Sequence, residues 1–277
     1  MRTVREALAE DGADVAGNAV FGVRDVLRAE IIAKEDTVLA GLPLLPVILA
    51  ETAVLEPGAW KTSAYAEDGD ELCAGTRAAS VEGSARVILR AERVILNFLC
   101  RLSGIAALTR SYVRALEGTG VRLLDTRKTA PGLRYPDKYA VSAGGGCNHR
   151  KTLYELPMLK DNHIEAMGGI TPAVQRLRSR LGSSVPVEVE CRTIEEALEA
   201  AACEVSRIML DNMSPEMIGN MLDRLPPHVE VEISGGIDLD NIRSFALAGG
   251  KRRADFISVG RLTHSAPAAD FSMRTSR

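Results

Sequence analysis

The residues best suited to chemistry are concentrated between Asp125 and Ile164. From Arg127 to His163 there are seven Lys or Arg and two His against three Asp or Glu, although the 277-residue chain has a formal net charge of −3. Proline and glycine residues, including the triple glycine 144–146, interrupt the basic side chains. Guanidinium and imidazole groups on such loops are suited to binding an anion. The alternative interpretation is a solvated basic surface.

Polar residues also follow six short apolar runs in the second half of the chain. The runs are 121–124, 157–159, 185–189, 207–210, 229–233 and 254–259, and the residues after them are Asp125, Lys160, Glu190, Asp211, Ser234 and Gly260. If the runs are parallel strands, these residues lie at one C-terminal mouth, where active sites of α/β barrels are found. Ser, Gly and Asp are common turn residues, but Lys160 and Glu190 are not. The pattern therefore favours a ring of functional groups.

Helix signals separate these runs and predict how the strands are connected. Helices are predicted to start at Thr171, Thr193, Ser214 and Asp238, from N-cap residues followed by proline or glutamate. Strands that alternate with helices indicate parallel βα units, and six or more in a row favour a closed or nearly closed barrel. Residues 139–142 could form one further strand.

The first part of the chain has a different pattern. Strands are predicted at 26–32, 37–42, 59–66, 78–82 and 85–89, with a short helix over 46–55. Short strands joined by turns predict an antiparallel sheet. From Glu92 to Leu116 the apolar residues recur every three or four positions, which predicts a helix that could divide in two at Ser103-Gly104.

Composition excludes several classes of protein. Aromatic residues make up only 4% of the chain and its net charge is negative, which leaves little for a nucleic-acid binder to use. The five cysteines form no C-x-x-C pair, which is typical of a reducing compartment. The N-terminus is charged at once, and the longest uncharged run, Thr37–Ala50, is 14 residues with two prolines, too short to span a bilayer. We expect a cytoplasmic protein without a membrane partner.

Eight short motifs together resemble the quinolinate phosphoribosyltransferase family, also called nicotinate-nucleotide pyrophosphorylase (carboxylating). They are Thr126–Thr129 before Pro131-Gly132, Gly144–Gly146, Asn148–Arg150, Lys160–His163, Val189-Glu190, Met209–Asn212, Ser234–Ile237, and Ser258–Gly260 with Leu262–His264. Any one of them is weak, but the order and spacing are similar to the family's from about Ala91 onward. The segment Asp11–Gly22 departs from it, because it lacks the Asp-x-Thr-[Ser/Thr] signature found there in relatives.

The resemblance implies a fold and a reaction. The fold is an N-terminal α+β open sandwich domain, residues 1–105, followed by an incomplete parallel α/β barrel of the seven-stranded type, residues 106–265, with the tail 266–277 returning to the first domain. The reaction is phosphoribosyl transfer from phosphoribosyl pyrophosphate to quinolinate with decarboxylation. It gives nicotinate mononucleotide, pyrophosphate and carbon dioxide in de novo NAD biosynthesis, and Mg²⁺ is the implied cofactor. The enzyme is a pentosyltransferase.

The resemblance also assigns roles to residues. Quinolinate would be bound by Arg93, Thr126, Arg127, His149 and Arg150, with Arg93 reaching in from the partner of a homodimer; a hexamer is the alternative assembly. Phosphoribosyl pyrophosphate would be bound by Lys128, Lys160, Glu190, Asp211, Ser234, Gly235 and Gly260. The catalytic residues would be Lys128, Lys160, Glu190 and Asp211, and the last two would hold Mg²⁺ directly or through water. Forked guanidinium donors suit a planar dianion with adjacent carboxylates.

Other functions are less favoured by the sequence. A related barrel transferase found with molybdate transport systems is disfavoured because Asn148–Arg150 and Lys160–His163 are intact. An inactive sensor of phosphorylated metabolites is disfavoured because both carboxylates and both lysines are present. The glycine-rich signatures of P-loop and dinucleotide-binding proteins are missing from the sequence.

Overall fold

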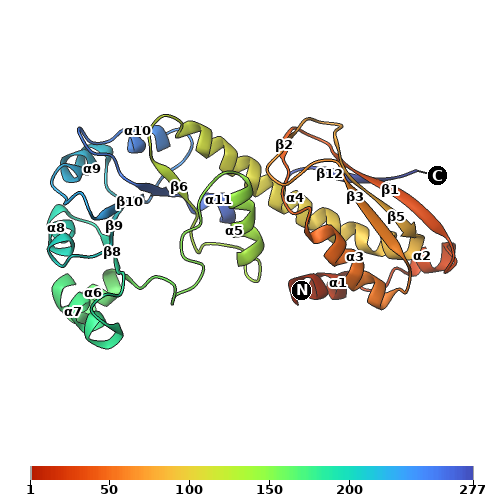
Figure 1. Cartoon of the computed structure of the whole chain (residues 1–277), viewed down its shortest axis with the longest axis horizontal. Coiled ribbons are helices and arrows are strands. Elements are labelled where there is room, and N and C mark those ends of the chain that lie inside the picture. Colours follow the sequence, from red (N-terminus) through yellow and green to blue (C-terminus); the bar gives the residue numbers. More distant parts are fainter. Residues whose placement is uncertain (1, 277) are drawn as a thin grey trace. The chain divides into compact units, whose positions relative to one another are not determined.

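The computed structural model describes residues 2–276 and divides into two compact units (Figure 1). Unit 1 contains the N-terminal residues up to Arg110, the segment Thr129–Gly145 and the C-terminal residues from Leu262. Unit 2 contains Ser111–Lys128 and Gly146–Arg261. The predicted domain ranges stay a prediction, and these units differ from them in that the segment 129–145 groups with unit 1.

Unit 1 is built on a four-stranded antiparallel sheet in the order β12-β1-β5-β3. The strands are β1 (Val26–Ala33), β3 (Trp60–Ala64), β5 (Arg77–Ser84) and β12 (Phe271–Ser276). Two further strands, β2 (Thr37–Val38) and β4 (Glu71–Leu72), form a separate antiparallel pair. The last strand of the chain therefore pairs with the first, from Arg28 opposite Ser276 to Ala33 opposite Phe271.

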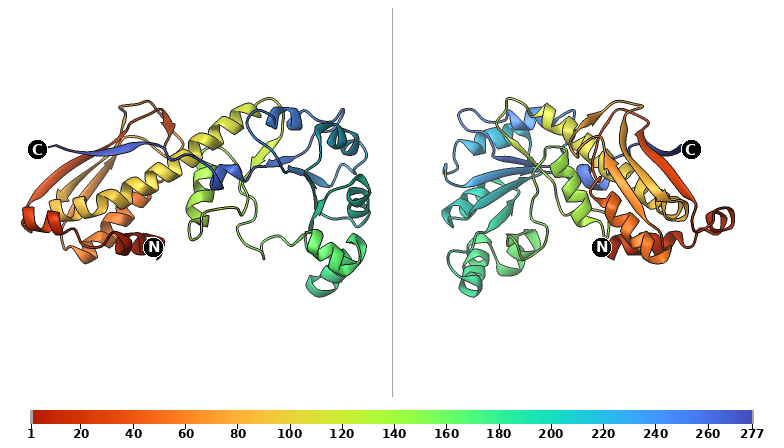
Figure 2. Two further views of the ribbon diagram at one scale, coloured as in Figure 1. Left: turned by 180° about the vertical axis from the view of Figure 1, so that it is seen from behind. Right: turned by 45° about the vertical axis from the view of Figure 1, so that its right-hand side comes forward.

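Helices lie on one side of this sheet (Figures 1 and 2). They are α1 (Arg2–Asp11), α3 (Leu44–Leu55) and the first part of α4 (Ala85–Ala115), while the short α2 (Val15–Val20) precedes β1. By length and composition alone α4 could cross a membrane, but 61% of its most apolar window is buried inside the structure, as in a core helix. Leu99 and Leu102 of α4 are both 1% exposed.

Three local predictions for this part of the chain differ from the structure. Residues 85–89 begin α4 instead of forming a strand, and residues 139–142 belong to α5 (Arg134–Ala143). The Ser103-Gly104 pair does not divide α4. Ser103 instead accepts a hydrogen bond from the amide of Ala40, and a β-carbon at position 104 would lie 1.9 Å from the carbonyl of Pro267. The glycine lets the C-terminal segment cross close to the helix.

An ion pair joins α5 to α4 within unit 1. Two guanidinium nitrogens of Arg101 lie 2.8 and 2.7 Å from the two carboxylate oxygens of Asp137, whose side chain is fully buried. The same carboxylate accepts the amide of Ala130 at 3.1 Å. The loop before α5 and the helix itself are thus held through one buried anion.

Unit 2 contains a six-stranded parallel sheet in the order β6-β11-β10-β9-β8-β7. The strands are β6 (Arg122–Leu124), β7 (Met158–Leu159), β8 (Glu188–Cys191), β9 (Arg207–Asp211), β10 (Glu230–Ser234) and β11 (Phe256–Ser258). All six predicted strands form. Because the last strand, β11, pairs with the first, β6, the sheet curls toward a barrel, and the predicted fold class is confirmed.

The barrel has a seventh, minimal strand and is not closed beside it. Cys147 forms a single parallel bridge with Leu124 of β6. In sheet order this residue would neighbour β7, but no pairing joins the two within the described residues 2–276. The irregular segment 148–157 lies between them in sequence. The incomplete edge of the barrel is therefore the place where the predicted Asn148–Arg150 motif lies.

Helices connect and cover the strands of unit 2 (Figure 1). They are α6 (Asp161–Met167), α7 (Ile170–Leu181), α8 (Ile194–Ala202), α9 (Pro215–Leu222) and α10 (Ile242–Ala246), and α11 (Arg261–His264) follows β11. The Thr193 side chain accepts a hydrogen bond from the backbone amide of Glu196, and the Ser214 side chain accepts one from the backbone amide of Met217. Both residues therefore cap their helices, as predicted.

Removing the Arg101 side chain should destabilise the protein. Arg101→Ala leaves the buried Asp137 carboxylate without its guanidinium, and we expect a loss of about 3 kcal/mol in the free energy of unfolding. Urea denaturation followed by circular dichroism measures it. Arg2→Ala is the matched control, because its partner Glu6 is 59% exposed and the pair is on the surface. Equal midpoints for the two variants would contradict the structural role of the pair.

Candidate active site

The polar residues predicted at strand ends lie at one edge of the parallel sheet of unit 2. Asp125 follows β6, Lys160 follows β7, Glu190 is inside β8, Asp211 and Ser234 end β9 and β10, and Gly260 is two residues beyond β11. In a parallel sheet all these positions are at the carboxyl edge. We call this edge the mouth.

Two of these residues are in direct contact. The Lys160 ammonium group is hydrogen-bonded to Oε2 of Glu190, and the Glu190 side chain is only 9% exposed while that of Lys160 is 43% exposed. Since β7 and β8 are adjacent and in register at Leu159 and Val189, the two strand ends bring the charges together. The buried acid therefore has a counter-ion that reaches solvent.

The next two strand ends are joined by a close backbone crossing. The amide of Asn212 donates to the carbonyl of Ser234 at 2.9 Å, and Asn212 adopts a left-handed φ of 56°. Its side-chain amide donates to Asp211 at 2.7 Å. Gly235 has a φ of +96°, and a β-carbon there would lie 2.3 Å from Oδ1 of Asn212. Only glycine fits this turn.

The Asn148–Arg150 motif is fixed by a buried aspartate at the end of β6. Asp125 is fully buried, and its two carboxylate oxygens accept the Asn148 side-chain amide and the backbone amide of His149, each at 2.8 Å. Its own amide donates to the carbonyl of Cys147 at 3.1 Å. A segment outside any regular strand is thus held in place by one side chain.

The imidazole of His149 points into the barrel, where two buried glutamates face it. Its Nε2 atom lies 3.3 Å from Oε2 of Glu188 and 3.2 Å from Oε2 of Glu232. Burial alone would lower the pKa of His149, but the hydrogen bonds and charges of the two carboxylates outweigh it and raise the pKa to about 9. Burial, followed by the charge of Glu232, raises the pKa of Glu188.

The predicted dicarboxylate residues Arg127 and Arg150 are close enough to influence each other. Burial and the neighbouring Arg127 charge lower the pKa of Arg150, because both disfavour its charged form. Arg150 donates to the carbonyl of Leu156 at 2.7 Å and lies 3.4 Å from the sulfur of Met158. His149 and Arg150 line one wall of a cavity of about 460 Å³ within unit 2. Its lining also includes the first residues of β6, β9, β10 and β11, so the cavity lies toward the amino edge of the sheet and not at the mouth.

The remaining predicted residues are more exposed or lie elsewhere. Thr126 accepts the amide of Lys128 at 3.0 Å, in the loop after β6, and Lys128 is exposed. Gly260 lies in the turn before α11. Arg93 belongs to unit 1, on an exposed position of α4. The site assignments as a whole stay predictions, but unit 2 gathers Lys160, Glu190, Asp211, Ser234 and Gly235 along adjacent strand ends.

Two groups of residues could hold a metal ion. Glu190 and Asp211 offer carboxylate oxygens at the mouth, which Mg²⁺ prefers, and Asp211 is partly accessible. His149, Glu188 and Glu232 have ligand atoms within 4.8 Å of one another. In that group, however, the Arg207 guanidinium lies 3.4 Å from the same Glu232 oxygen that faces the ring. The mouth carboxylates fit a hard cation better.

Sequence reasoning missed Glu188, Glu232 and Arg192. The two glutamates lie inside runs that the sequence analysis treats as apolar. Each is two residues before a predicted mouth residue on the same strand, so the two side chains point to the same face of the sheet. This two-residue spacing was the signal that could have identified them. Arg192 forms an ion pair with Asp161. Its pKa is raised mainly by that hydrogen bond, with contributions from Glu190 and Asp211. No sequence pattern marks this residue.

Comparison with known proteins decides which family has this arrangement. The quinolinate phosphoribosyl transferase C-terminal domain matches residues 105–274, and the N-terminal domain of the same family matches residues 14–103. The chain belongs to the quinolinate phosphoribosyl transferase family. The predicted family resemblance is therefore confirmed over nearly the whole chain.

Individual relatives of the family agree. The chain is 40% identical over 260 residues to a probable nicotinate-nucleotide pyrophosphorylase [carboxylating] of Bacillus subtilis, covering 94% of this chain and 87% of the relative. It is 38% identical to quinolinate phosphoribosyltransferase [decarboxylating] 1 of Nicotiana glauca, and the match covers 98% of this chain and 81% of the relative.

Solved structures of the family are also similar to this one. The crystal structure of NadC from Streptococcus pyogenes matches with a TM-score of 0.91 and 40% identity, covering 99% of this chain and 95% of that one. A nicotinate-nucleotide pyrophosphorylase from Ehrlichia chaffeensis matches with a TM-score of 0.91 and 34% identity, covering 99% and 98%. The family's two-domain fold is thus shared over its full length.

The turn at Gly235 offers a sharp test of the mouth. In Gly235→Ala the new methyl group must displace Asn212, and we expect the variant to lose on the order of 1–3 kcal/mol of stability and most of its activity. Gly236→Ala is the matched control, because Gly236 also has a positive φ, +64°, but nothing lies within 4 Å of its β-carbon. Thermal unfolding and steady-state kinetics compare them. The mouth geometry described here is wrong if the two variants behave alike.

Proposed function

We propose that this member of the family transfers the phosphoribosyl group of phosphoribosyl pyrophosphate to quinolinate and removes one carboxylate as carbon dioxide. The products are nicotinate mononucleotide, pyrophosphate and carbon dioxide, and the reaction serves NAD biosynthesis. The observation that carries the proposal is that both family domains match consecutively. Four residues that the proposal uses for the donor support it by their positions, since Lys160, Glu190, Asp211 and Ser234 lie at or beside adjacent strand ends of unit 2.

Binding of the two substrates uses different parts of the site. Quinolinate is a planar dianion, and the guanidinium groups of Arg127 and Arg150 bind its two adjacent carboxylates. The positive charges of these two arginines repel each other, so a bound dianion would stabilise them. Lys128 and Lys160 bind the phosphate charges of the donor, and Glu190 and Asp211 bind the ribose hydroxyls. Ser234, Gly235 and Gly260 offer backbone amides to the 5′-phosphate.

Chemistry occurs at the anomeric carbon of the ribose. As the bond to pyrophosphate breaks, positive charge develops on the ribose, and the pyridine nitrogen of quinolinate captures that carbon. The carboxylates of Glu190 and Asp211 stabilise the developing cation, while the lysines stabilise the departing pyrophosphate. The quaternised ring then accepts the electron pair of the adjacent carbon–carboxylate bond. Carbon dioxide leaves, and the ring carbon takes up a proton from solvent.

Magnesium fits the donor set at the mouth. Glu190 and Asp211 would hold it, directly or through water, because carboxylate oxygens at strand ends are hard ligands. Bound there, the ion would neutralise charge on the pyrophosphate group. Lys160 is hydrogen-bonded to one Glu190 oxygen, so Mg²⁺ would be held by the other Glu190 oxygen and by Asp211.

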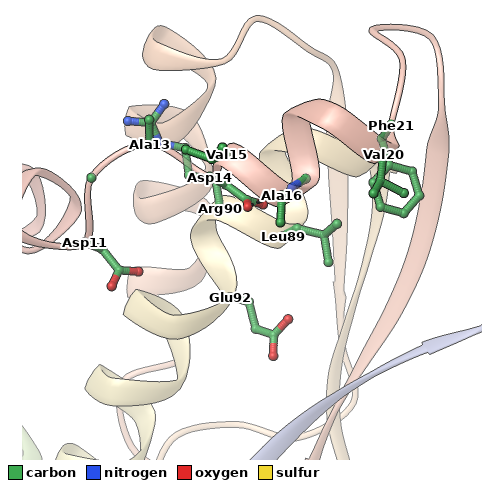
Figure 3. Close-up of a pocket in the computed structure, with 12 residues that line it drawn as sticks. Asp11, Ala13, Asp14, Val15, Ala16, Val20, Phe21, Leu89, Arg90 and Glu92 are labelled. Atoms are coloured by element: carbon green, nitrogen blue, oxygen red, sulfur yellow. Dashed lines mark hydrogen bonds between the residues drawn. The ribbon is translucent and has the colours of Figure 1, made fainter.

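The proposed active assembly is a homodimer in which Arg93 completes the partner's site. Unit 1 has an exposed apolar surface that includes Val15, Val20, Val23 and Val26, each at least 67% exposed. Between the segment Asp11–Phe21 and Leu89–Glu92 of α4 lies a cavity of about 570 Å³ (Figure 3). An apolar surface of this kind, next to a cavity that reaches α4 just before Arg93, supports an interface.

A direct assay tests the activity. The purified protein is incubated with quinolinate, phosphoribosyl pyrophosphate and Mg²⁺, using quinolinate labelled in the carboxylate beside the ring nitrogen. Labelled carbon dioxide and nicotinate mononucleotide should appear in equal amounts and only when all three are present. Nicotinate in place of quinolinate is the control for substrate class. Turnover of nicotinate alone would exclude the proposed reaction.

Glu190→Gln should lower kcat with the fold intact. The amide keeps the size of the side chain but removes the charge that stabilises the ribosyl cation and Mg²⁺, so we expect a fall of roughly 100-fold in kcat. Initial rates over a range of both substrates measure it. Glu204→Gln, at an exposed position in the turn between α8 and β9 and so at the amino edge of the sheet, should be unaffected. Wild-type turnover in Glu190→Gln would refute the role.

Mixing two inactive variants tests the shared site. Arg93→Ala and Lys160→Ala proteins, unfolded and refolded together in equal amounts, form hybrid dimers with one intact site. Roughly a quarter of the wild-type activity should return by random pairing. As a control, Arg93→Ala mixed with a chain carrying both substitutions forms no intact site and should stay inactive. Without recovery in the first mixture, Arg93 does not act across an interface.

A further inference from the structure

Glu188 and Glu232 are two fully buried carboxylates for which the proposed reaction has no role so far. Both are 0% exposed, on the inner face of β8 and β10. A buried carboxylate costs several kcal/mol unless nearby charges and hydrogen bonds compensate it. Two of them on one side of a barrel core therefore require an explanation.

Their closest shared cation is His149. One ring nitrogen, Nε2, lies within 3.2–3.4 Å of both carboxylates. Among the described residues 2–276, Oε2 of Glu188 and Oε1 of Glu232 have no hydrogen-bond partner. The ring, whose side chain is 6% exposed, thus provides the main compensation that reaches both glutamates.

The other charged groups around the ring do not balance the two glutamates unless His149 is protonated. They are Glu188 on β8, Arg207 on β9, Glu230 and Glu232 on β10, and Arg150 and Asp125 beside the backbone of His149. Arg207 lies 2.7 Å from Glu230 but 3.4 Å from Glu232, so its charge is mainly used by Glu230. A neutral His149 would leave the inner face of the sheet with excess negative charge.

The contacts at the two ring nitrogens favour different protonation states of His149. The backbone amide of Arg150 donates to Nδ1 at 2.7 Å, which favours the neutral ring. The two carboxylates share the single Nε2–H, and their negative charges 3.2 and 3.3 Å from that nitrogen favour the imidazolium. Two buried negative charges outweigh one neutral amide, so the charged ring is the stable form.

We propose that Glu188 and Glu232 are positioning residues for quinolinate binding: from inside the barrel they hold His149 as an imidazolium. The charged ring, with its backbone fixed by Asp125, offsets the two buried glutamates and adds a positive charge next to Arg150. This inference rests on the proposed function for its substrate, a dianion that a negative barrel core would otherwise repel. His149 acts here through its charge and through the placement of Arg150.

Nuclear magnetic resonance of histidine tests the charge without any assay of activity. The chain has four His, so protein labelled with ¹³C in the imidazole gives four ring signals, and His149→Gln assigns one of them. In the wild type the His149 signal should be that of an imidazolium at pH 7.5 and titrate near the raised value of about 9. A neutral His149 ring at pH 7.5 would overturn the inference.

Kinetics of charge-removing variants test the consequence. In Glu188→Gln and Glu232→Gln the titration midpoint of His149 should fall by about one pH unit or more. At pH 9 this shift would lower the charged fraction of the ring from about a half to about a tenth, so the quinolinate KM should rise about fivefold, with the KM for phosphoribosyl pyrophosphate and kcat changed less. Glu204→Gln is the control, because Glu204 is exposed in the turn between α8 and β9. If Glu188→Gln and Glu232→Gln keep the wild-type midpoint and quinolinate KM, as the control should, the positioning role is wrong.

The two measurements separate this inference from the proposed reaction. Should a glutamine variant fail to fold, the wild-type titration still decides the charge of the ring. If the titration is as expected but no quinolinate is consumed, the proposed reaction fails and the quinolinate role falls with it. If quinolinate is consumed while His149 is neutral at pH 7.5, only the inference fails.

Discussion

The structure of unit 2 depends on pairing the charges that line the inside of a parallel sheet. Val189 of β8 and Val187 just before it are fully buried. The alternate residues Glu188 and Glu190 point to the other face of the strand, where they contact His149 and Lys160. A barrel of this size has too little water inside to solvate them, and each charge needs a partner. Two of those partners, His149 and Lys160, come from outside the strands. The loops of the site are thus held against the barrel because they supply the counter-ions of its buried carboxylates.

The gap in the barrel follows from the same constraint. Cys147 contributes one bridge and β7 only two residues, so the ladder does not hold the segment between them. Side chains replace it: Asp125 accepts two hydrogen bonds from the start of the segment, and Arg150 donates to its end at Leu156. Because this edge of the barrel is open, its basic residues need not follow strand geometry. Their guanidinium groups can therefore be arranged to bind a ligand with two carboxylates.

Sequence patterns predicted the strands of unit 2 because each is a short apolar run bounded by a polar residue and a helix cap. They failed where local pattern and tertiary context disagree. Residues 85–89 alternate like a strand, yet they continue into the long buried helix α4, which the core of unit 1 favours. The two N-terminal helices α1 and α2 have few buried residues and so give a weak periodic signal. Glu188 and Glu232 were missed because a glutamate in an apolar run is informative only once the inward face of the strand is known.

The period of a strand explains why binding and charge control lie so close in the sequence. Glu188 and Glu190 are two residues apart on β8, and Glu232 and Ser234 are two apart on β10. The member nearer the carboxyl end lies at the mouth, where it can meet a ribose or a cation. The earlier member lies one layer deeper, where water is excluded and a charge is held in place by its neighbours. A substitution in the deeper layer therefore acts on the site through electrostatics, with no need for contact with a substrate.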